Sequence, residues 1–260
     1  GLESDADRVL RFMASNYLSA IAQKTGFLVK SKCSRDRVTI HVGGETIEEE
    51  DHQRILGIVV NNKLTWNDHV YGNGGLLQAV NQRIGALRRV VGYVPQKSFS
   101  HITNAIVSSK VRYGISIYGD VRTEQQEPLT AASKDIQIAM NRAMRMVTGC
   151  RLSDRVSISE LVARSGLPTF NRMAAEEKTM LIWKAINEPA RPLSRFCRLG
   201  STNATNLRSS SCGDIKLFSR STLGQRNFPE AAVRVWNRAD PILRSQAKRT
   251  LVKNKIKSFS

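Results

Sequence analysis

The sequence predicts an α+β protein: a small antiparallel segment, then a mostly helical remainder with a basic helical extension at its C-terminal end. Apolar residues alternate with a period of two at Val38, Ile40 and Val42, which is typical of a half-buried strand. From Trp66 onward they recur at helical spacing instead. The excess of basic residues also begins in this second, helical part.

The net charge of +18 in 260 residues points to a polyanionic partner, either a nucleic acid or an anionic membrane surface. The charge rises along the chain, with net 0 over residues 1–65, +6 over 66–190 and +12 over 191–260. Arginine, whose guanidinium group makes forked contacts with phosphate, outnumbers lysine in the last of these segments. No apolar run reaches the ~18 residues of a membrane span, so we expect no membrane association.

Cysteine usage and the start of the chain give two further expectations. The four cysteines are not spaced as CxxC pairs, which indicates reduced thiols in an intracellular protein. The histidines do not supply zinc-ligand spacing either. The chain starts without Met and enters a predicted helix almost at once, so we expect it to be a fragment of a longer protein.

In the first part, helical spacing predicts a helix over residues 4–16, and a short apolar run predicts a strand over 27–30. The alternating strand, 37–42, leads into Gly43-Gly44, a two-residue hairpin turn. The acidic run at 48–51 is best explained as a solvated loop, with metal binding as the less favoured alternative.

The segment Gln53–Trp66 marks the change from strands to helices. It opens with an apolar run on which we predict a single strand, Gln53–Val60, covered on both faces. Gly57 within this strand would allow a bulge or the close approach of another backbone. Asn61-Asn62 then turns the chain toward the helical part.

Helical periodicity predicts most of the remaining elements. The strongest helix is 125–148, which has cations near its C-terminal end and Gly149 as its stop. A capping box, Ser157–Glu160, predicts the start of a shorter helix. The other expected elements are helices over 76–91 and 99–106, a kink or helix end within 111–119, a helix running to about Asn187, a polar linker at 200–213, a helix over 227–244 and a final basic helix.

Catalytic motifs of the common hydrolases and phosphate-binding loops are absent. The glycine-rich stretch 72–75 lacks the lysine and Ser/Thr of a phosphate loop and is best explained as a flexible lead into a helix. Phe218, Phe228 and Trp236 are interleaved with arginines near the C-terminus, although Trp236 is favoured as a core anchor. The function that these residues favour is therefore the binding of a polyanion.

Several segments, in order along nearly the whole chain, resemble the downstream part of the reverse transcriptase of non-LTR retrotransposons. They are Asn16–Ser19 with Lys24–Val29, the hairpin Val38–Ile47, Ile55–Gly57 with Lys63–Trp66 and His69, Arg83–Arg89, Lys110–Gly119, Asp135–Gly149 and Arg226–Arg244. A single match of this kind would be weak, whereas the full ordered set is fairly specific.

The resemblance implies four segments: a palm remnant (1–65), a helical thumb (66–190), a basic polar linker (191–227) and a basic C-terminal helical segment (228–260). It implies that Lys24 is the motif D lysine that protonates the leaving pyrophosphate, and that Leu56 and Gly57 belong to the primer grip. The cations expected to contact nucleic acid are Arg83, Arg88, Arg89, Arg142, Arg145, Arg226, Arg234, Arg238, Lys248, Arg249 and Lys253.

The catalytic Tyr-x-Asp-Asp motif of that family is not in this chain, and Asp5 and Asp7 are no substitute because they lie on a predicted helix. Polymerases use such aspartates to hold two Mg²⁺ ions. We therefore expect no cofactor in this chain, Mg²⁺ only in a full-length parent enzyme, and no polymerase activity from the chain alone.

The departure Ser19–Ala22 from the family pattern weakens the motif D loop and hints at a decaying copy. The expected partner is RNA or an RNA–DNA duplex, bound mainly through phosphates, in an intracellular ribonucleoprotein of the nucleus or cytoplasm. The alternatives are a nucleic-acid-binding protein adopted by a host and a relic without function.

Overall fold

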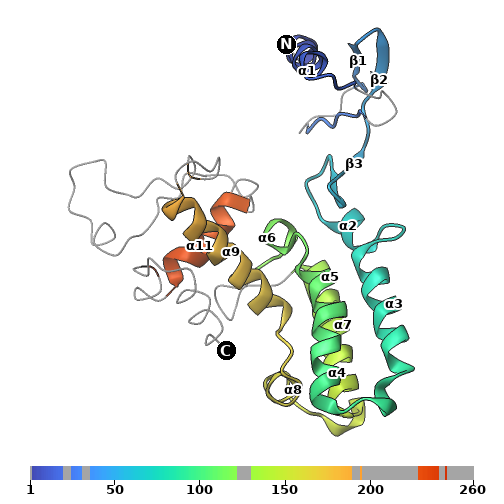
Figure 1. Ribbon diagram of the computed structural model, residues 1–260, viewed down its shortest axis with the longest axis vertical. Helices are drawn as coiled ribbons and strands as arrows, with labels where there is room; N and C mark the ends of the chain where they lie inside the picture. Colours follow the sequence, from blue (N-terminus) through green and yellow to red (C-terminus); the bar gives the residue numbers. More distant parts are fainter. Residues whose placement is uncertain are drawn as a thin grey trace, which may run out of the picture. The chain divides into compact units, whose positions relative to one another are not determined.

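The computed structural model describes residues 2–19, 25–30, 36–121, 130–188, 194, 228–239 and 244. About 63% of these residues are helical, and they include two small antiparallel sheets of two strands each, so the predicted α+β class is confirmed. The chain forms two compact units, unit 1 over Gly1–Gly75 and unit 2 over Leu76–Ser260 (Figure 1). The boundary predicted from the sequence, between residues 65 and 66, lies ten residues before the observed boundary after Gly75. The short helix Asn67–Tyr71 therefore belongs to unit 1 and not to the helical part.

Unit 1 begins with helix α1 (Leu2–Ser15), which covers a hairpin made of β1 (Thr39–Val42) and β2 (Glu45–Glu48). The two turn residues, Gly43 and Gly44, both have positive φ, as the predicted tight hairpin requires. Alternation places Ile40, Val42 and Ile47 on one face, where Leu10 of α1 packs against them. The predicted strand at 27–30 is reduced to one bridge, between Phe27 and Glu49.

The prediction of one strand over 53–60 is wrong, because the segment folds back on itself as β3 (His52–Ile55) and β4 (Ile58–Asn61). Leu56 and Gly57 form the turn, with φ of 49° and 83°. The tip of this hairpin is therefore not covered on both faces, and the Leu56 side chain is 85% exposed.

Helix α2 (Asn67–Tyr71) closes unit 1 and is joined to β4 by one buried amide. Asn61 Nδ2 donates to Thr65 Oγ1 at 2.8 Å and to Asp68 Oδ2 at 2.9 Å, while Asn61 Oδ1 accepts from the Thr65 backbone N–H at 2.8 Å. A buried amide with its polar atoms hydrogen-bonded in this way fixes the position of α2 on β4.

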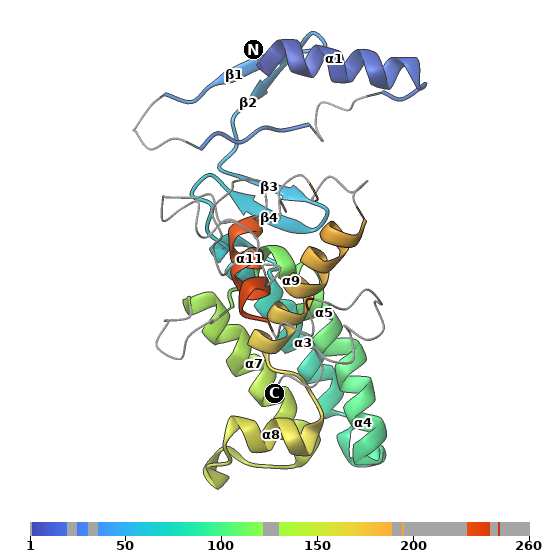
Figure 2. The same cartoon turned by 90° about the vertical axis from the view of Figure 1, so that its left-hand side faces the viewer.

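Unit 2 is built from long helices that run alternately in opposite directions (Figures 1 and 2). The elements are α3 (Leu76–Arg88), a 3₁₀ turn (Val91–Tyr93), α4 (Gln96–Thr103), a π-helical turn (Asn104–Ser108), α5 (Ser109–Arg112), α6 (Ile115–Tyr118), α7 (Ala131–Thr148), a 3₁₀ turn (Leu152–Asp154), α8 (Ile158–Ser165), α9 (Phe170–Asn187) and α11 (Phe228–Arg238). Helix α7 packs against α3, α4, α8 and α9, and α11 packs on α9.

Local signals explain several helix ends in unit 2. Gly149 and Gly166 end α7 and α8 in the left-handed conformation that glycine adopts at low cost. The Ser157 side chain accepts a hydrogen bond from the Glu160 N–H, as predicted for the start of α8. The chain also turns at Gly114, within the predicted break at 111–119. The predicted helix over 125–148 begins at Ala131, and residues 122–129 lie outside the described residues.

A second hydrophobic cluster lies between α9 and α11, where Trp183 packs with Val233 and Trp236. Trp236 is therefore a core residue, as the sequence analysis favoured. The predicted final basic helix and most of the predicted linker fall outside the described residues.

Lys178 on α9 is a buried cation, with 1% of its surface exposed. Its Nζ donates a 2.7 Å hydrogen bond to the backbone carbonyl of Ser116 on α6. Desolvation lowers the pKa of Lys178 to about 8, and the charge of Asp120 opposes that shift. The folded protein therefore carries the cost of a desolvated ammonium group whenever the pH is below this value.

We predict that Lys178 makes unit 2 more stable as the pH rises from about 8 to about 10.5. In this window the unfolded chain still binds the proton that the folded chain has released, so the free energy of unfolding increases with pH, by up to ~3 kcal/mol in total. Urea unfolding followed by tryptophan fluorescence measures this directly. The Lys178→Met variant should lose this contribution, and stability–pH curves that run parallel for the two proteins would refute it.

Candidate nucleic-acid interface

The alternating helix directions of unit 2 bring two separate connections to one end of the helices (Figures 1 and 2). The first runs from the end of α3 to the start of α4, and the second from the end of α7 to the start of α8. We call residues 88–97 and 149–157 together the basic tip. Gln96 Nε2 donates to the Arg164 carbonyl at 3.4 Å and Ser100 Oγ to the Ser165 carbonyl at 2.5 Å, which holds α4 against the end of α8.

The second connection is fixed from inside by Arg145, near the end of α7. Its guanidinium group donates to the carbonyl of Arg151 at 3.0 Å and to that of Val156 at 3.4 Å. Asp154 accepts the Arg151 backbone N–H at 2.6 Å, which closes the short turn between them. The backbone of this loop is thus held by specific hydrogen bonds, although most of its side chains are exposed.

The basic tip carries five exposed cations and one carboxylate. The cations are Arg88, Arg89, Lys97, Arg151 and Arg155. None of them forms an ion pair with a side chain in the described ranges. The carboxylate, Asp154, is already engaged by a backbone N–H. Such a surplus of positive charge on exposed side chains favours the binding of phosphate groups.

Other arginines of unit 2 are already neutralised. Arg112 and Arg172 share Glu176, at 3.0 Å in both cases, and so join α5 to α9. Arg164 pairs with Glu160 one turn away on α8, at 2.5 Å. Within the described residues, none of these carboxylates pairs with one of the five cations of the basic tip.

The three arginines predicted on α3 do not share one face. Arg83 and Arg88 are five positions apart, which is about 140° around an α-helix. Arg83 is half-buried and donates to the Ala79 carbonyl at 3.3 Å, whereas Arg88 and Arg89 are exposed at the end of the helix. Only the last two therefore belong to the basic tip.

The predicted residues of α7 and α11 also have different surroundings. Arg142 is exposed on α7, one turn from Ile138 and two turns from Lys134, while Arg145 supports the loop described above. Arg234 is half-buried and Arg238 exposed on α11, and both already interact with other groups of the protein. Lys24, Arg226, Lys248, Arg249 and Lys253 lie outside the described residues.

Lys97, Arg151 and Arg155 were not predicted as binding residues. Lys97 is the second residue of α4, and Arg151 and Arg155 flank a 3₁₀ turn, so nothing in the local sequence marks them. The signal that could have identified them is topological, because successive antiparallel helices place alternate connections at the same end.

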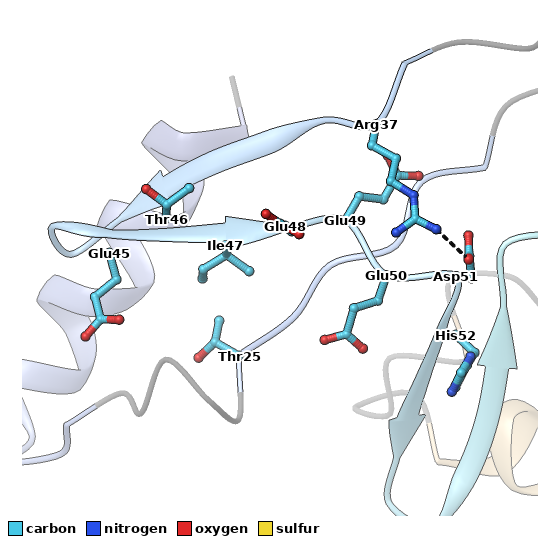
Figure 3. Close-up of a pocket in the computed structure, with 10 residues that line it drawn as sticks. All are labelled: Thr25, Arg37, Glu45, Thr46, Ile47, Glu48, Glu49, Glu50, Asp51 and His52. Atoms are coloured by element: carbon cyan, nitrogen blue, oxygen red, sulfur yellow. Dashed lines mark hydrogen bonds and ion pairs between the residues drawn. The ribbon is translucent and has the colours of Figure 1, made fainter.

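Unit 1 has a cavity of about 540 Å³ with an acidic wall (Figure 3). Its lining includes Glu48, Glu50 and Asp51, and Asp51 forms a 2.8 Å ion pair with Arg37. The acidic run is solvated only in part, because Glu48, Glu50 and Asp51 are exposed, whereas Glu49 is buried and accepts the Val38 N–H at 3.2 Å. Among the described residues no group of His, Cys, Asp and Glu could hold a metal ion. This wall does not suit an anionic ligand.

Comparison with known proteins found no matching family model, no similar curated protein and no similar solved structure. No helix within the described ranges is long and apolar enough to cross a membrane. The resemblance to a reverse transcriptase therefore remains an inference from the sequence segments quoted above.

Arg155 provides a test in which stability and binding change in opposite directions. Its φ of 49° is unfavourable for a residue with a Cβ atom and acceptable for glycine. We predict that Arg155→Gly raises the free energy of unfolding by about 1 kcal/mol and weakens binding to an RNA–DNA hybrid, as measured by urea unfolding and fluorescence anisotropy. Arg155→Ala is the matched control, which should weaken binding to the same extent without gaining the stability. A less stable Arg155→Gly protein would contradict the prediction.

Proposed function

We propose that this chain is the nucleic-acid-holding part of a reverse transcriptase of the non-LTR retrotransposon type. In this proposal unit 2 corresponds to the thumb and holds an RNA or RNA–DNA duplex through its backbone phosphates. The observation that carries the proposal is the basic tip, where five exposed cations have no ion-pair partner among the described side chains. The ordered sequence segments supply the link to this family.

Phosphate binding explains the tip better than the reading of bases does. Its cations come from two connections and the adjoining helix ends and include both arginine and lysine, which suits contacts with a repeating backbone. The surplus is not shared by unit 1, where residues 1–65 have no net charge. Binding should therefore be strong at low salt and largely independent of sequence.

We propose no polymerase activity for this chain alone. The sequence contains no Tyr-x-Asp-Asp motif, and in the resembled family this motif holds the two Mg²⁺ ions that carry the chemistry. The role left to this chain is to bind and orient a template–primer for aspartates located elsewhere in the parent enzyme.

The salt dependence of binding to a labelled RNA–DNA hybrid tests the proposal. We predict that the logarithm of the association constant falls steeply and linearly with the logarithm of the KCl concentration. The double variant Arg88→Ala/Arg89→Ala should bind more weakly, with a slope smaller by about two, since each lost phosphate contact lowers the slope by about one. Fluorescence anisotropy of the full chain between 50 and 300 mM KCl, about the range in which such binding weakens, gives both quantities.

Arg37→Ala is the matched control, because Arg37 is an exposed arginine of unit 1 that is paired with Asp51. It removes one positive charge without touching unit 2, so the slope should stay close to that of the wild type. An affinity that does not change with salt would contradict the proposal, as would an equal loss in the control.

A further inference from the structure

Each loop of the basic tip also displays apolar side chains between its cations: Val90, Val91 and Tyr93 are exposed in the first loop and Leu152 in the second, and Tyr93 and Leu152 are by far the most exposed. Tyr93, with 87% of its surface exposed, lies between Arg89 and Lys97 in the first loop. Leu152, 81% exposed, lies between Arg151 and Arg155 in the second loop. Their apolar surface is not used in folding and is available to a ligand that also meets the neighbouring cations.

The backbone that carries Tyr93 is held on both sides. The Tyr93 N–H donates to the Val90 carbonyl at 3.1 Å, and the Val90 N–H donates to the Leu87 carbonyl at 3.0 Å, so consecutive turns connect the residue to α3. Two residues further on, the Pro95 carbonyl accepts the Phe99 N–H at 2.9 Å and starts α4. The phenol ring is therefore presented from a fixed loop between two packed helices.

We propose that the basic tip binds single-stranded nucleic acid, with an unpaired base stacked on Tyr93 and the neighbouring phosphates held by Arg88, Arg89 and Lys97. This deepens the proposed function and rests on it, because it names the form of nucleic acid that the tip prefers. An exposed aromatic ring among cations is the arrangement by which proteins hold single strands without sequence preference.

The chemistry of the two kinds of strand explains this choice. In a duplex each base lies between its neighbours, so the faces of the bases are hidden and only phosphates and groove edges are offered. An unpaired base has a free face that can stack on the tyrosine ring. An anionic membrane is the competing ligand, because residues 90–95 form an apolar run between cations, with Val90 and Val91 exposed beside Tyr93. The exposure of the aromatic ring, 87% against 41% and 37% for the two valines, favours stacking of a base, and vesicle binding is one outcome of the test below.

The test compares a twelve-nucleotide oligouridine RNA with an RNA–DNA hybrid of equal length, using the full chain and fluorescence anisotropy. Tyr93→Ala should weaken binding to the single strand about tenfold, within the range found for the loss of one base stack. It should change binding to the hybrid less than twofold. Tyr93→Phe keeps the ring and should bind both ligands like the wild type.

Tyr17→Ala is the matched control, because Tyr17 is a fully exposed tyrosine of unit 1, and this variant should bind the single strand normally. Equal weakening of both ligands by Tyr93→Ala, or no change for the single strand, would overturn the inference. The inference also fails if Tyr93→Ala abolishes binding to phosphatidylserine vesicles but leaves RNA binding intact.

The same measurements separate this inference from the proposed function. If the wild-type chain binds oligouridine in a Tyr93-dependent way but does not bind the hybrid, single-strand binding is supported and the holding of a duplex is refuted. A chain that binds the hybrid with the predicted salt slope but shows no Tyr93 effect would do the reverse. A chain that binds neither ligand would remove both.

Discussion

The burial of α7 is the constraint on which unit 2 depends. Ile136, Met140 and Ala143 recur at helical spacing on this helix and are almost completely buried, and α3, α4, α8 and α9 pack around it. Because the long helices alternate in direction around α7, the connections 88–97 and 149–157 lie at one end. The basic tip is thus a consequence of core packing, although none of its own side chains belongs to the core.

Charge is distributed in unit 2 so that the carboxylates stabilise helices and the surplus cations remain available. Glu176 joins α5 to α9 through Arg112 and Arg172, and Asp154 closes a turn. Lys178 shows the opposite case, a cation placed inside the protein, where its positive charge costs stability below about pH 8. The cations of the tip avoid this cost because they stay in water until a ligand replaces it.

Local sequence signals predicted elements well, and tertiary arrangement poorly. The Gly43-Gly44 turn, the start of α8 at Ser157 and the end of α7 at Gly149 follow from single residues with a clear conformational preference. The β3–β4 hairpin was missed because its turn begins at Leu56, a residue with no preference for positive φ. The tip was only partly predicted, through Arg88 and Arg89, since its other cations become neighbours only when the helices pack.

Crosslinking of the full chain to a 4-thiouridine-containing RNA, followed by mass spectrometry of the peptides, tests most directly whether the basic tip contacts nucleic acid. We predict crosslinked peptides from both 88–97 and 149–157, and loss of these crosslinks at high salt, since phosphate contacts are screened there. Crosslinks that form elsewhere in the chain while both segments remain unmodified would contradict the central claim.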